Sequence, residues 1–241
     1  MFDLLMFDLD GTLVDTAPEI ADAANDVLRS LNLRTASDAQ ARNWIGNGAR
    51  ELMVWAIADA GGGEESTIRD DTPYMNDVMQ QFAQAYTVRC GQRSQLFPNV
   101  VGTLRSLQGR GIPLALVTNK EGRLTQRVLE VHHLRPYFDT VVAGDTLARG
   151  KPDPMQLQHC LDHYRVAADK ALMVGDSAVD VAAARAAGVT CWAVPYGYNR
   201  GRPISTEQPD RLINDISTVL EAVSGNASPT TGIAGKGPTR A

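Results

Sequence analysis

Asp8 and Asp10 stand two positions apart in the segment DLDGT (residues 8–12), directly after the apolar run LLMF (residues 4–7). Side chains two positions apart on a strand point to the same side. Gly11 predicts a turn, so both carboxylates would lie at a strand's carboxyl end, where open α/β sheets bind ligands. Carboxylates there can act as nucleophile and as general acid or base. A solvated turn would also favour Asp and Gly, so the segment needs support from elsewhere.

Three further groups of polar residues occupy comparable positions in the chain. They are Thr118 with Asn119 after the run 114–117, Lys151 with Pro152 before a helical segment, and Asp176 with Asp180 after the run 171–174. Because parallel strands end at one edge of a sheet, we expect these groups to gather around the first two aspartates. Any one of them could be a helix cap or a surface lysine, but four in this order favour a site.

Short apolar runs alternate with helix-length segments along much of the chain. The runs cover 4–7, 114–117, 140–143, 171–174 and 191–194, and helical candidates cover 100–108, 123–131, 155–164 and 179–187. Short continuous apolar runs are typical of strands that are buried on both faces of a parallel sheet. The predicted fold class is therefore α/β, with a doubly wound, mostly parallel sheet as its core.

The interval from Thr16 to about Ser94 breaks this alternation, because it contains helical patterns and no good strand. Thr16 followed by Glu19 predicts a capping box at the start of the first helix. We expect an inserted all-helical cap domain at 16–93, with the core domain formed by 1–15 and 94–223. Residues 224–241 are rich in Ser, Gly, Thr and Pro and are predicted to form a disordered tail.

Composition excludes several classes of protein. The 241 residues include 23 Lys and Arg against 28 Asp and Glu, for a net charge of −5. Such a chain, without a basic block, is a poor candidate for binding nucleic acid or an anionic membrane. There is no signal-peptide pattern and no apolar run of about 18 residues, and the three cysteines lack metal-ligand spacing. We expect a cytoplasmic protein with free thiols, as a monomer or homodimer.

The ordered motifs resemble those of the haloacid dehalogenase superfamily of phosphotransferases. The matching positions are Asp8-x-Asp10-x-Thr12, then Thr118, then Lys151, and last the acidic pair Asp176 and Asp180. The resemblance spans about residues 3–200, and the insert resembles the helical cap of that family. The segments WIGNGA (44–49), VTNK (117–120) and YGYN (196–199) resemble the phosphoglycolate phosphatase subfamily of bacteria.

The resemblance implies catalytic and metal-binding roles. It makes Asp8 the nucleophile that forms an aspartyl-phosphate, and Asp10 the acid and then the base. It assigns the metal ligands to Asp8, Asp176 and the backbone carbonyl of Asp10. The acidic residues and a phosphate of roughly −2 charge outweigh Lys151 by about four charges, so a divalent cation is needed. Hard oxygen ligands favour Mg²⁺, the predicted cofactor.

The resemblance also implies how the substrate is bound. Thr118, Asn119 and Lys151 would hold the phosphate, and Asp180 would orient Lys151 or a metal-bound water. If the leaving group is glycolate, its carboxylate needs amide or cationic partners. Asn47 and Gly48, at a predicted helix start, are candidate amide donors. Lys120, Arg50 and Arg123 are candidate counter-charges.

The predicted function is Mg²⁺-dependent hydrolysis of 2-phosphoglycolate to glycolate and phosphate. A phosphatase or phosphomutase for another small phosphorylated metabolite, such as a sugar phosphate, shares the four motifs and stays open. A dehalogenase does not need the segment Asp10-Gly11-Thr12, so these residues argue against it. A non-enzymatic binding protein would be expected to have lost part of the catalytic set, which is complete here.

Overall fold

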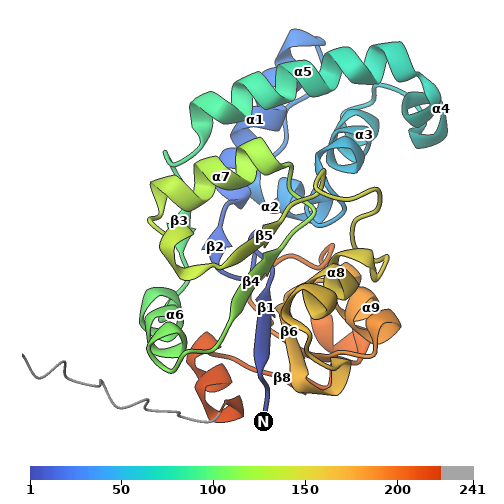
Figure 1. Cartoon of the computed structure of the whole chain (residues 1–241). Helices are drawn as coiled ribbons and strands as arrows, with labels where there is room; N and C mark the ends of the chain where they lie inside the picture. Colours follow the sequence, from blue (N-terminus) through green and yellow to red (C-terminus); the bar gives the residue numbers. More distant parts are fainter. Residues whose placement is uncertain (224–241) are drawn as a thin grey trace, which may run out of the picture.

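The computed structural model describes residues 1–223, in which a six-stranded sheet has helices on both faces (Figure 1). Its strands are β1 (Leu4–Phe7), β4 (Leu114–Val117), β5 (Thr140–Val142), β6 (Ala171–Gly175), β7 (Thr190–Ala193) and β8 (Arg211–Leu212). They pair in the order β5-β4-β1-β6-β7-β8, and every pair is parallel. This confirms the predicted α/β fold class. The predicted tail, 224–241, lies outside the described residues.

The apolar runs are continuous because the sheet is covered on both sides. The helices that flank it are α6 (Val100–Gly109), α7 (Gly122–Val131), α8 (Met155–Tyr164) and α9 (Ala178–Ala187). Leu5 and Phe7 of β1 belong to the cluster that includes α6 and α7. Leu4 and Met6 belong to the cluster that includes α8 and α9. All four side chains are fully buried, as expected for a central parallel strand.

The order of the strands creates a ligand-binding edge. From β1 the chain proceeds outward through β4 and β5, then returns to the other side of β1 and proceeds outward through β6 and β7. The direction therefore reverses between β1 and β6. Open α/β sheets bind ligands at such a reversal, outside the carboxyl ends of the strands. Asp8 and Asp176 come directly after these two strands.

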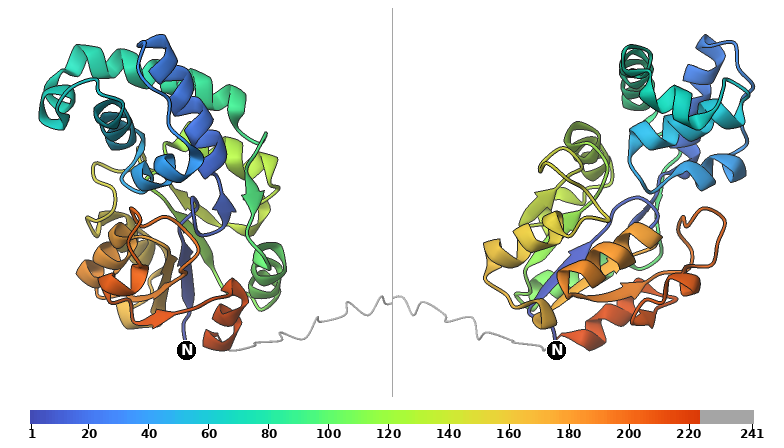
Figure 2. Two further views of the ribbon diagram at one scale, coloured as in Figure 1. Left: turned by 180° about the vertical axis from the view of Figure 1, so that it is seen from behind. Right: turned by 90° about the vertical axis from the view of Figure 1, so that its right-hand side faces the viewer.

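A group of helices is inserted between β1 and β4 in the chain. Its elements are α1 (Ala17–Ser30), α2 (Asp38–Ala41), η1 (Arg42–Trp44), α3 (Ala49–Asp59), α4 (Glu65–Asp70) and α5 (Thr72–Arg89). We call residues 17–89 the helical insert. Figure 2 shows it stacked over the carboxyl ends of the sheet strands. The antiparallel pair β2 (Val14–Asp15) and β3 (Gln95–Leu96) carries both chain passages between the insert and the sheet. The division at residues 16 and 93 stays a prediction.

The start of α1 differs from the predicted capping box. Thr16 precedes the helix, but its side chain accepts no capping hydrogen bond, and its hydroxyl donates to Asp10 Oδ1 at 2.6 Å. Glu19 is fully buried and accepts a hydrogen bond from the Tyr86 hydroxyl at 3.1 Å. The prediction was wrong because both side chains bind partners outside the local cap: Thr16 binds Asp10, six positions earlier, and Glu19 binds Tyr86 of α5.

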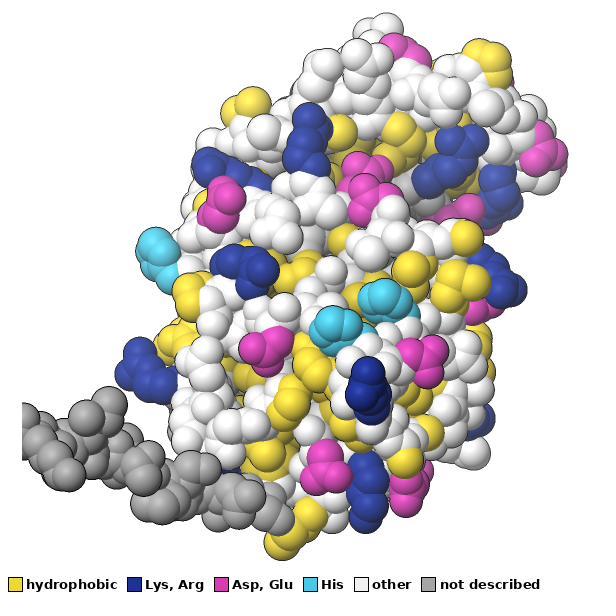
Figure 3. Space-filling view, in the orientation of Figure 1, with side chains coloured by type: hydrophobic (Ala, Val, Ile, Leu, Met, Phe, Trp, Pro, Cys, Tyr) yellow, Lys and Arg dark blue, Asp and Glu magenta, His cyan; other side chains and the backbone are white. Residues whose placement is uncertain are grey.

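The remaining elements were not predicted, because each spans only two to seven residues. They are β8, whose two residues are exposed, and the 3-10 helices η2 (Arg135–Tyr137), η3 (Ala168–Lys170), η4 (Ile204–Glu207) and η5 (Ile216–Ala222). All three cysteines are buried free thiols. Within residues 1–223, no helix combines the length and apolarity needed to cross a membrane. Positive and negative side chains are interspersed on the face shown in Figure 3.

Candidate active site

The site begins with a sharp turn after β1. Asp8 follows the strand, and Gly11 adopts a positive φ of 89°. A Cβ at Gly11 would lie 2.3 Å from Asp176 Oδ2, so the turn needs glycine both for its conformation and for this close approach. The turn therefore places the segment after β1 directly against the segment after β6.

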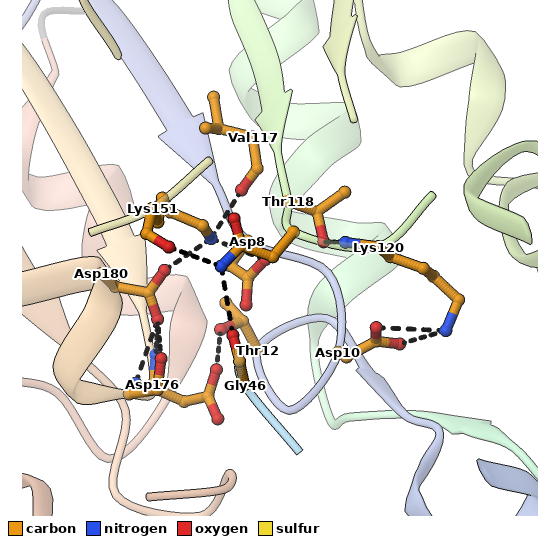
Figure 4. Close-up of polar contacts among 12 residues, drawn as sticks. Asp8, Asp10, Thr12, Gly46, Val117, Thr118, Lys120, Lys151, Asp176 and Asp180 are labelled. Carbon is orange, nitrogen blue, oxygen red and sulfur yellow. Dashed lines mark hydrogen bonds and ion pairs between the residues drawn. The ribbon is translucent and has the colours of Figure 1, made fainter. Parts of the chain in front are cut away.

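Lys151 joins two of the carboxylates (Figure 4). Its Nζ lies 2.9 Å from Asp8 Oδ1 and 2.6 Å from Asp180 Oδ1. It also donates to the backbone carbonyl of Val117, at the end of β4, at 2.8 Å. The lysine side chain is 1% exposed. A buried lysine held by two carboxylates and a carbonyl is a fixed positive charge beside Asp8.

Asp176 and Asp180 are held by donors from several segments. Asp176 Oδ1 accepts from the Thr12 hydroxyl at 2.8 Å, and Oδ2 accepts from the Tyr198 N–H at 2.5 Å. Asp180 Oδ2 accepts from the N–H and hydroxyl of Ser177, at 3.0 and 2.6 Å, and from the Asp176 N–H at 3.2 Å. Asp180 thus orients Lys151 with one oxygen and the segment after β6 with the other.

Burial dominates the electrostatics of the cluster. It raises the pKa of Asp8 to about 6, although Lys151 acts in the opposite direction. Burial, together with the charges of Asp180 and Asp8, raises the pKa of Asp176 well above its ordinary value. Burial lowers the pKa of Lys151, but the two carboxylates outweigh it and leave that pKa raised. The cluster is therefore short of positive charge.

The acidic cluster fits an oxygen-liganded cation. One carboxylate oxygen from each of Asp8, Asp176 and Asp180 lies within 4.8 Å of the other two, and all three residues are buried. Asp8 Oδ1 is buried beside Lys151 but accepts no well-directed hydrogen bond within residues 1–223. Buried carboxylates with an unused lone pair and a deficit of positive charge are suited to a hard divalent ion.

Asp10 points away from this cluster, toward a second lysine (Figure 4). Lys120 Nζ lies 3.2 and 3.1 Å from the two Asp10 oxygens, and the Thr16 hydroxyl donates to one of them at 2.6 Å. The lysine also lies over the ring of Tyr86 in α5, 4.2 Å from its centroid. Asp10 is therefore oriented by Thr16, just before α1, and by Lys120, in the loop after β4.

A cavity brings the two halves of the site together. Its lining from the sheet side comprises Asp8, Asp10, Thr118, Asn119, Lys120, Glu121 and Leu124, and from the insert Ile20, Ile45, Gly46, Gly48, Ala49, Leu52 and Phe82. The cavity volume is about 50 Å³, measured to the centres of water-sized molecules, which is room for a few waters. One end is thus charged and the opposite wall is mostly apolar.

Similarity to known proteins agrees with this geometry. Residues 5–194 match the family model of the haloacid dehalogenase-like hydrolases. The chain belongs to this family. It is 39% identical to the phosphoglycolate phosphatase of Vibrio cholerae, covering 91% of this chain and 96% of that one. It is 40% identical to phosphoglycolate phosphatase 1 of Pseudomonas aeruginosa, over 90% and 78%. A crystal structure of a predicted phosphoglycolate phosphatase from Haemophilus somnus superimposes with a TM-score of 0.85, at 33% identity over 92% and 97%.

This haloacid dehalogenase-like hydrolase gathers most of the predicted site residues. Thr118 is buried, and its hydroxyl accepts from the Lys120 N–H at 3.2 Å. The Asn119 side chain donates to Lys151 O at 2.8 Å and to Gly46 O of the insert at 3.3 Å. Predicted phosphate-binding and insert residues therefore meet at one point.

The predicted specificity residues separate into two groups. Lys120 and Gly48 line the cavity, and Gly48 precedes the first turn of α3. Asn47 is exposed and is not part of the lining. The structure likewise places Arg50 and Arg123 outside it: Arg50 donates to Arg69 O at 3.4 Å, and Arg123 is exposed.

Several residues of the site were not predicted. Thr16 and Tyr86 orient Asp10 and Lys120, Tyr198 donates to Asp176, and apolar insert residues such as Leu52 and Phe82 form the far wall. The helical spacing of the apolar residues indicated burial but not which surface they face. The segment YGYN signalled the subfamily, and its contacts required the tertiary structure.

Proposed function

We propose that this hydrolase is a Mg²⁺-dependent phosphatase that hydrolyses 2-phosphoglycolate. The observation that carries the proposal is the cavity in which the Asp8 carboxylate, ion-paired to buried Lys151, faces the insert beside Thr118 and Asp10. The relatives named phosphoglycolate phosphatase support the choice of substrate, since the chain aligns with almost the whole length of one of them. The product alcohol is then glycolate.

In the first half-reaction Asp8 is the nucleophile. One of its oxygens attacks phosphorus, the bond from phosphorus to the glycolate oxygen breaks, and an aspartyl-phosphate forms. Asp10, which lines the same cavity, protonates the departing oxygen. In the second half-reaction Asp10 takes a proton from water, which attacks phosphorus and releases Asp8 and phosphate.

Thr118 and Lys151 bind the transferred phosphate in this proposal. The Thr118 oxygen is already an acceptor for the Lys120 N–H, so its own proton is free to face a phosphate oxygen. Lys151 is held by Asp180 and Val117 O and presents its charge beside Asp8. Fixed donors of this kind stabilise charge in the transition state without having to reorganise.

We assign the metal site to Asp8, Asp176 and the backbone carbonyl of Asp10, with Asp180 orienting its neighbours. A bound Mg²⁺ would neutralise charge between the phosphate and Asp8 and polarise the phosphoryl group. The hydrogen bonds that Thr12 and Tyr198 donate to Asp176 leave its oxygens with further lone pairs for such an ion. This set of ligands differs from the cluster of three carboxylates that lie within 4.8 Å of one another, because that cluster includes Asp180.

The cavity supports a short, anionic leaving group. Among the described residues 1–223, the only basic side chain in the cavity lining is that of Lys120. The N-terminus of α3 also lines the cavity, through Gly48 and Ala49. Lys120 pairs with ionised Asp10; when Asp10 is protonated for its role as the acid, the lysine charge is available to the substrate carboxylate, which the α3 N-terminus also attracts. The apolar wall offers few partners for the hydroxyl groups of a sugar ring, which favours a small leaving group. Asn47, Arg50 and Arg123 are left without this role.

We further propose that the helical insert acts as a cap that covers the site during turnover. Asn119 already bridges to Gly46 O of the insert, and such closure excludes water from the first half-reaction. The same proposal places the enzyme in the cytoplasm as a monomer or homodimer. Its ligand would be a small phosphorylated metabolite, and it would bind neither nucleic acid nor a membrane.

A panel of phosphate monoesters tests the proposal. Purified protein is assayed with 2-phosphoglycolate, hexose phosphates and other small esters, in Mg²⁺ and after chelation. We expect 2-phosphoglycolate to have the highest kcat/KM and chelation to abolish turnover. Preference for a hexose phosphate would overturn the substrate and leave the mechanism standing. Inactivity toward every ester would overturn the function.

A further inference from the structure

Tyr198, in the loop after β7, contacts both the acidic cluster and the helical insert. Its backbone N–H donates to Asp176 Oδ2 at 2.5 Å. Its hydroxyl donates to Asp15 of β2 and accepts from the N–H of Ala17, the first residue of α1, at 3.0 Å. Its ring lies beneath the Arg42 guanidinium of η1, whose central carbon is 5.1 Å from the ring centroid. The contacts of Tyr198 with Asp15, Ala17 and Arg42 have no role in the proposed reaction.

The loop around Tyr198 is closely packed against the acidic cluster. A Cβ on Gly197 would lie 2.3 Å from Asp176 Oδ2 and 2.4 Å from Gly11 O. Asn199 Oδ1 accepts from the N–H of Ala178, the first residue of α9, at 3.0 Å. Tyr198 itself is 2% exposed. A displacement of its ring is therefore transmitted to the backbone N–H that orients Asp176.

The insert is attached to the same loop by charged side chains. Arg42 donates to both oxygens of Asp15, at 3.1 and 2.8 Å, so the arginine and the tyrosine share one carboxylate. Arg200 lies over the ring of Trp55 in α3, 4.1 Å from its centroid. Figure 2 shows this loop rising from the sheet toward the insert. The loop after β7 therefore contacts the insert and also donates the hydrogen bond to Asp176.

We propose that Tyr198 is a positioning residue that couples the placement of the helical insert to the orientation of Asp176. The inference rests on the proposed function, in which Asp176 is a metal ligand. Contacts that fix the insert also fix Tyr198, and through it the ligand oxygen. Because coupling free energies are reciprocal, metal binding at Asp176 in turn favours the insert position shown here.

Two variants separate this role from loss of the hydrogen bond to Asp176. Tyr198→Phe keeps the backbone N–H and the ring and removes the hydroxyl. Arg42→Gln acts from the insert and does not touch Asp176. Binding of Mn²⁺ in the absence of substrate is followed by the loss of its free electron paramagnetic resonance signal. We expect each variant to raise the Mn²⁺ Kd by about fivefold, and the double variant to raise it no further than the larger single effect.

Arg93→Gln is the matched control, because Arg93 also pairs with two aspartates of the insert, Asp22 and Asp38. We expect it to bind Mn²⁺ as the wild type does. An unchanged Kd in Tyr198→Phe or Arg42→Gln, additive effects in the double variant, or equal weakening in Arg93→Gln would each overturn the coupling. If Tyr198→Phe does not fold, Arg42→Gln decides. Because no substrate is present, the result is independent of whether the ester panel supports the phosphatase.

Discussion

At the scale of single residues, the site combines three buried carboxylates with one fully buried lysine. Burial raises the pKa of Asp8 and of Asp176, so ionising these groups costs free energy that a cation can return. The second lysine, Lys120, neutralises Asp10 instead and stays in the cavity lining. The two aspartates of one short motif therefore sit in different environments, which suits them to different roles.

Replacing the nucleophile tests the assignment of Asp8. Asp8→Asn keeps the size of the side chain and removes its negative charge. We expect kcat for 2-phosphoglycolate to fall at least about 1,000-fold, because no other carboxylate takes its position. Steady-state kinetics is the measurement. Asp3→Asn, at an exposed position just before β1, is the control and should retain wild-type activity. Full activity in Asp8→Asn would contradict the mechanism.

Metal affinity should depend on pH. The pKa of Asp8 in the metal-free protein is raised to about 6, so below pH 6 a proton must leave before this carboxylate can bind a cation. Affinity for Mg²⁺ is therefore expected to rise by at least about tenfold per pH unit below pH 6 and to keep rising above it, because the pKa of Asp176 is raised as well. Calorimetric titrations at pH 5, 6 and 7 provide the test. A Kd that is constant from pH 5 to 7 would show that no ligand titrates there.

At the scale of elements, the site depends on loops that follow parallel strands and pass close to one another. The turn after β1, the segment after β6 and the loop after β7 meet at Asp176, and glycines permit the approach. Asp180 adds an N-terminal cap to α9 while it holds Lys151. Each loop is anchored by the strand that precedes it and by hydrogen bonds to its neighbours, which explains how polar groups far apart in sequence keep ångström-scale positions.

Gly197 is expected to tolerate no side chain. In Gly197→Ala the new Cβ would collide with Asp176 Oδ2 and Gly11 O, so we expect a loss of about 2 kcal/mol in the free energy of unfolding together with weaker metal binding. Gly102→Ala, within α6 and with no atom near its Cβ, should instead add about 0.5–1 kcal/mol. Urea unfolding measures both. Equal stability of the two variants would refute the packing argument.

At the scale of the whole molecule, the insert and the sheet are joined through β2 and β3 and by a buried carboxylate. Glu19 is fully buried in α1 and accepts from the Tyr86 hydroxyl, from the Gly91 N–H at 2.8 Å and from the Ser94 N–H at 3.1 Å. The last two donors lie between α5 and β3. Glu19 therefore anchors the returning chain passage to the outgoing one.

Removing this anchor should destabilise the molecule. Glu19→Ala leaves buried donors without an acceptor, and we expect the free energy of unfolding to fall by about 3 kcal/mol. Glu130→Ala, at an exposed position in α7, should change it by less than about 0.5 kcal/mol. Urea unfolding followed by circular dichroism compares them. A loss below 1 kcal/mol in Glu19→Ala would mean that water or a rearranged loop satisfies the donors.

The acidity of the chain also acts at this scale. A net charge of −5 gives no general attraction for an anionic ester. On the face shown in Figure 3, charges of both signs are mixed. Attraction must then come from within the site. There Lys151 pairs with Asp8 and Lys120 pairs with Asp10, and a bound cation would offset the remaining negative charge. Local rather than overall charge decides which ligand this molecule accepts.

The amino-acid sequence alone determined the sheet and the positions of its polar strand ends. Runs such as 4–7 and 114–117 are continuous because both faces of a central strand are buried, and this pattern is local. The spacing of Asp8, Lys151 and Asp176 relative to such runs was therefore enough to predict that they meet.

Only the tertiary structure decided the partners of those residues. Lys120 pairs with Asp10 across 110 positions, and Tyr198 reaches both Asp176 and Asp15. The predicted capping box failed because the Thr16 hydroxyl donates to Asp10, six positions earlier, and because Tyr86, 67 positions away, donates to the Glu19 carboxylate. Periodicity reports which face of an element is buried. Which side chain lies opposite depends on how whole elements pack, and no local pattern contains that information.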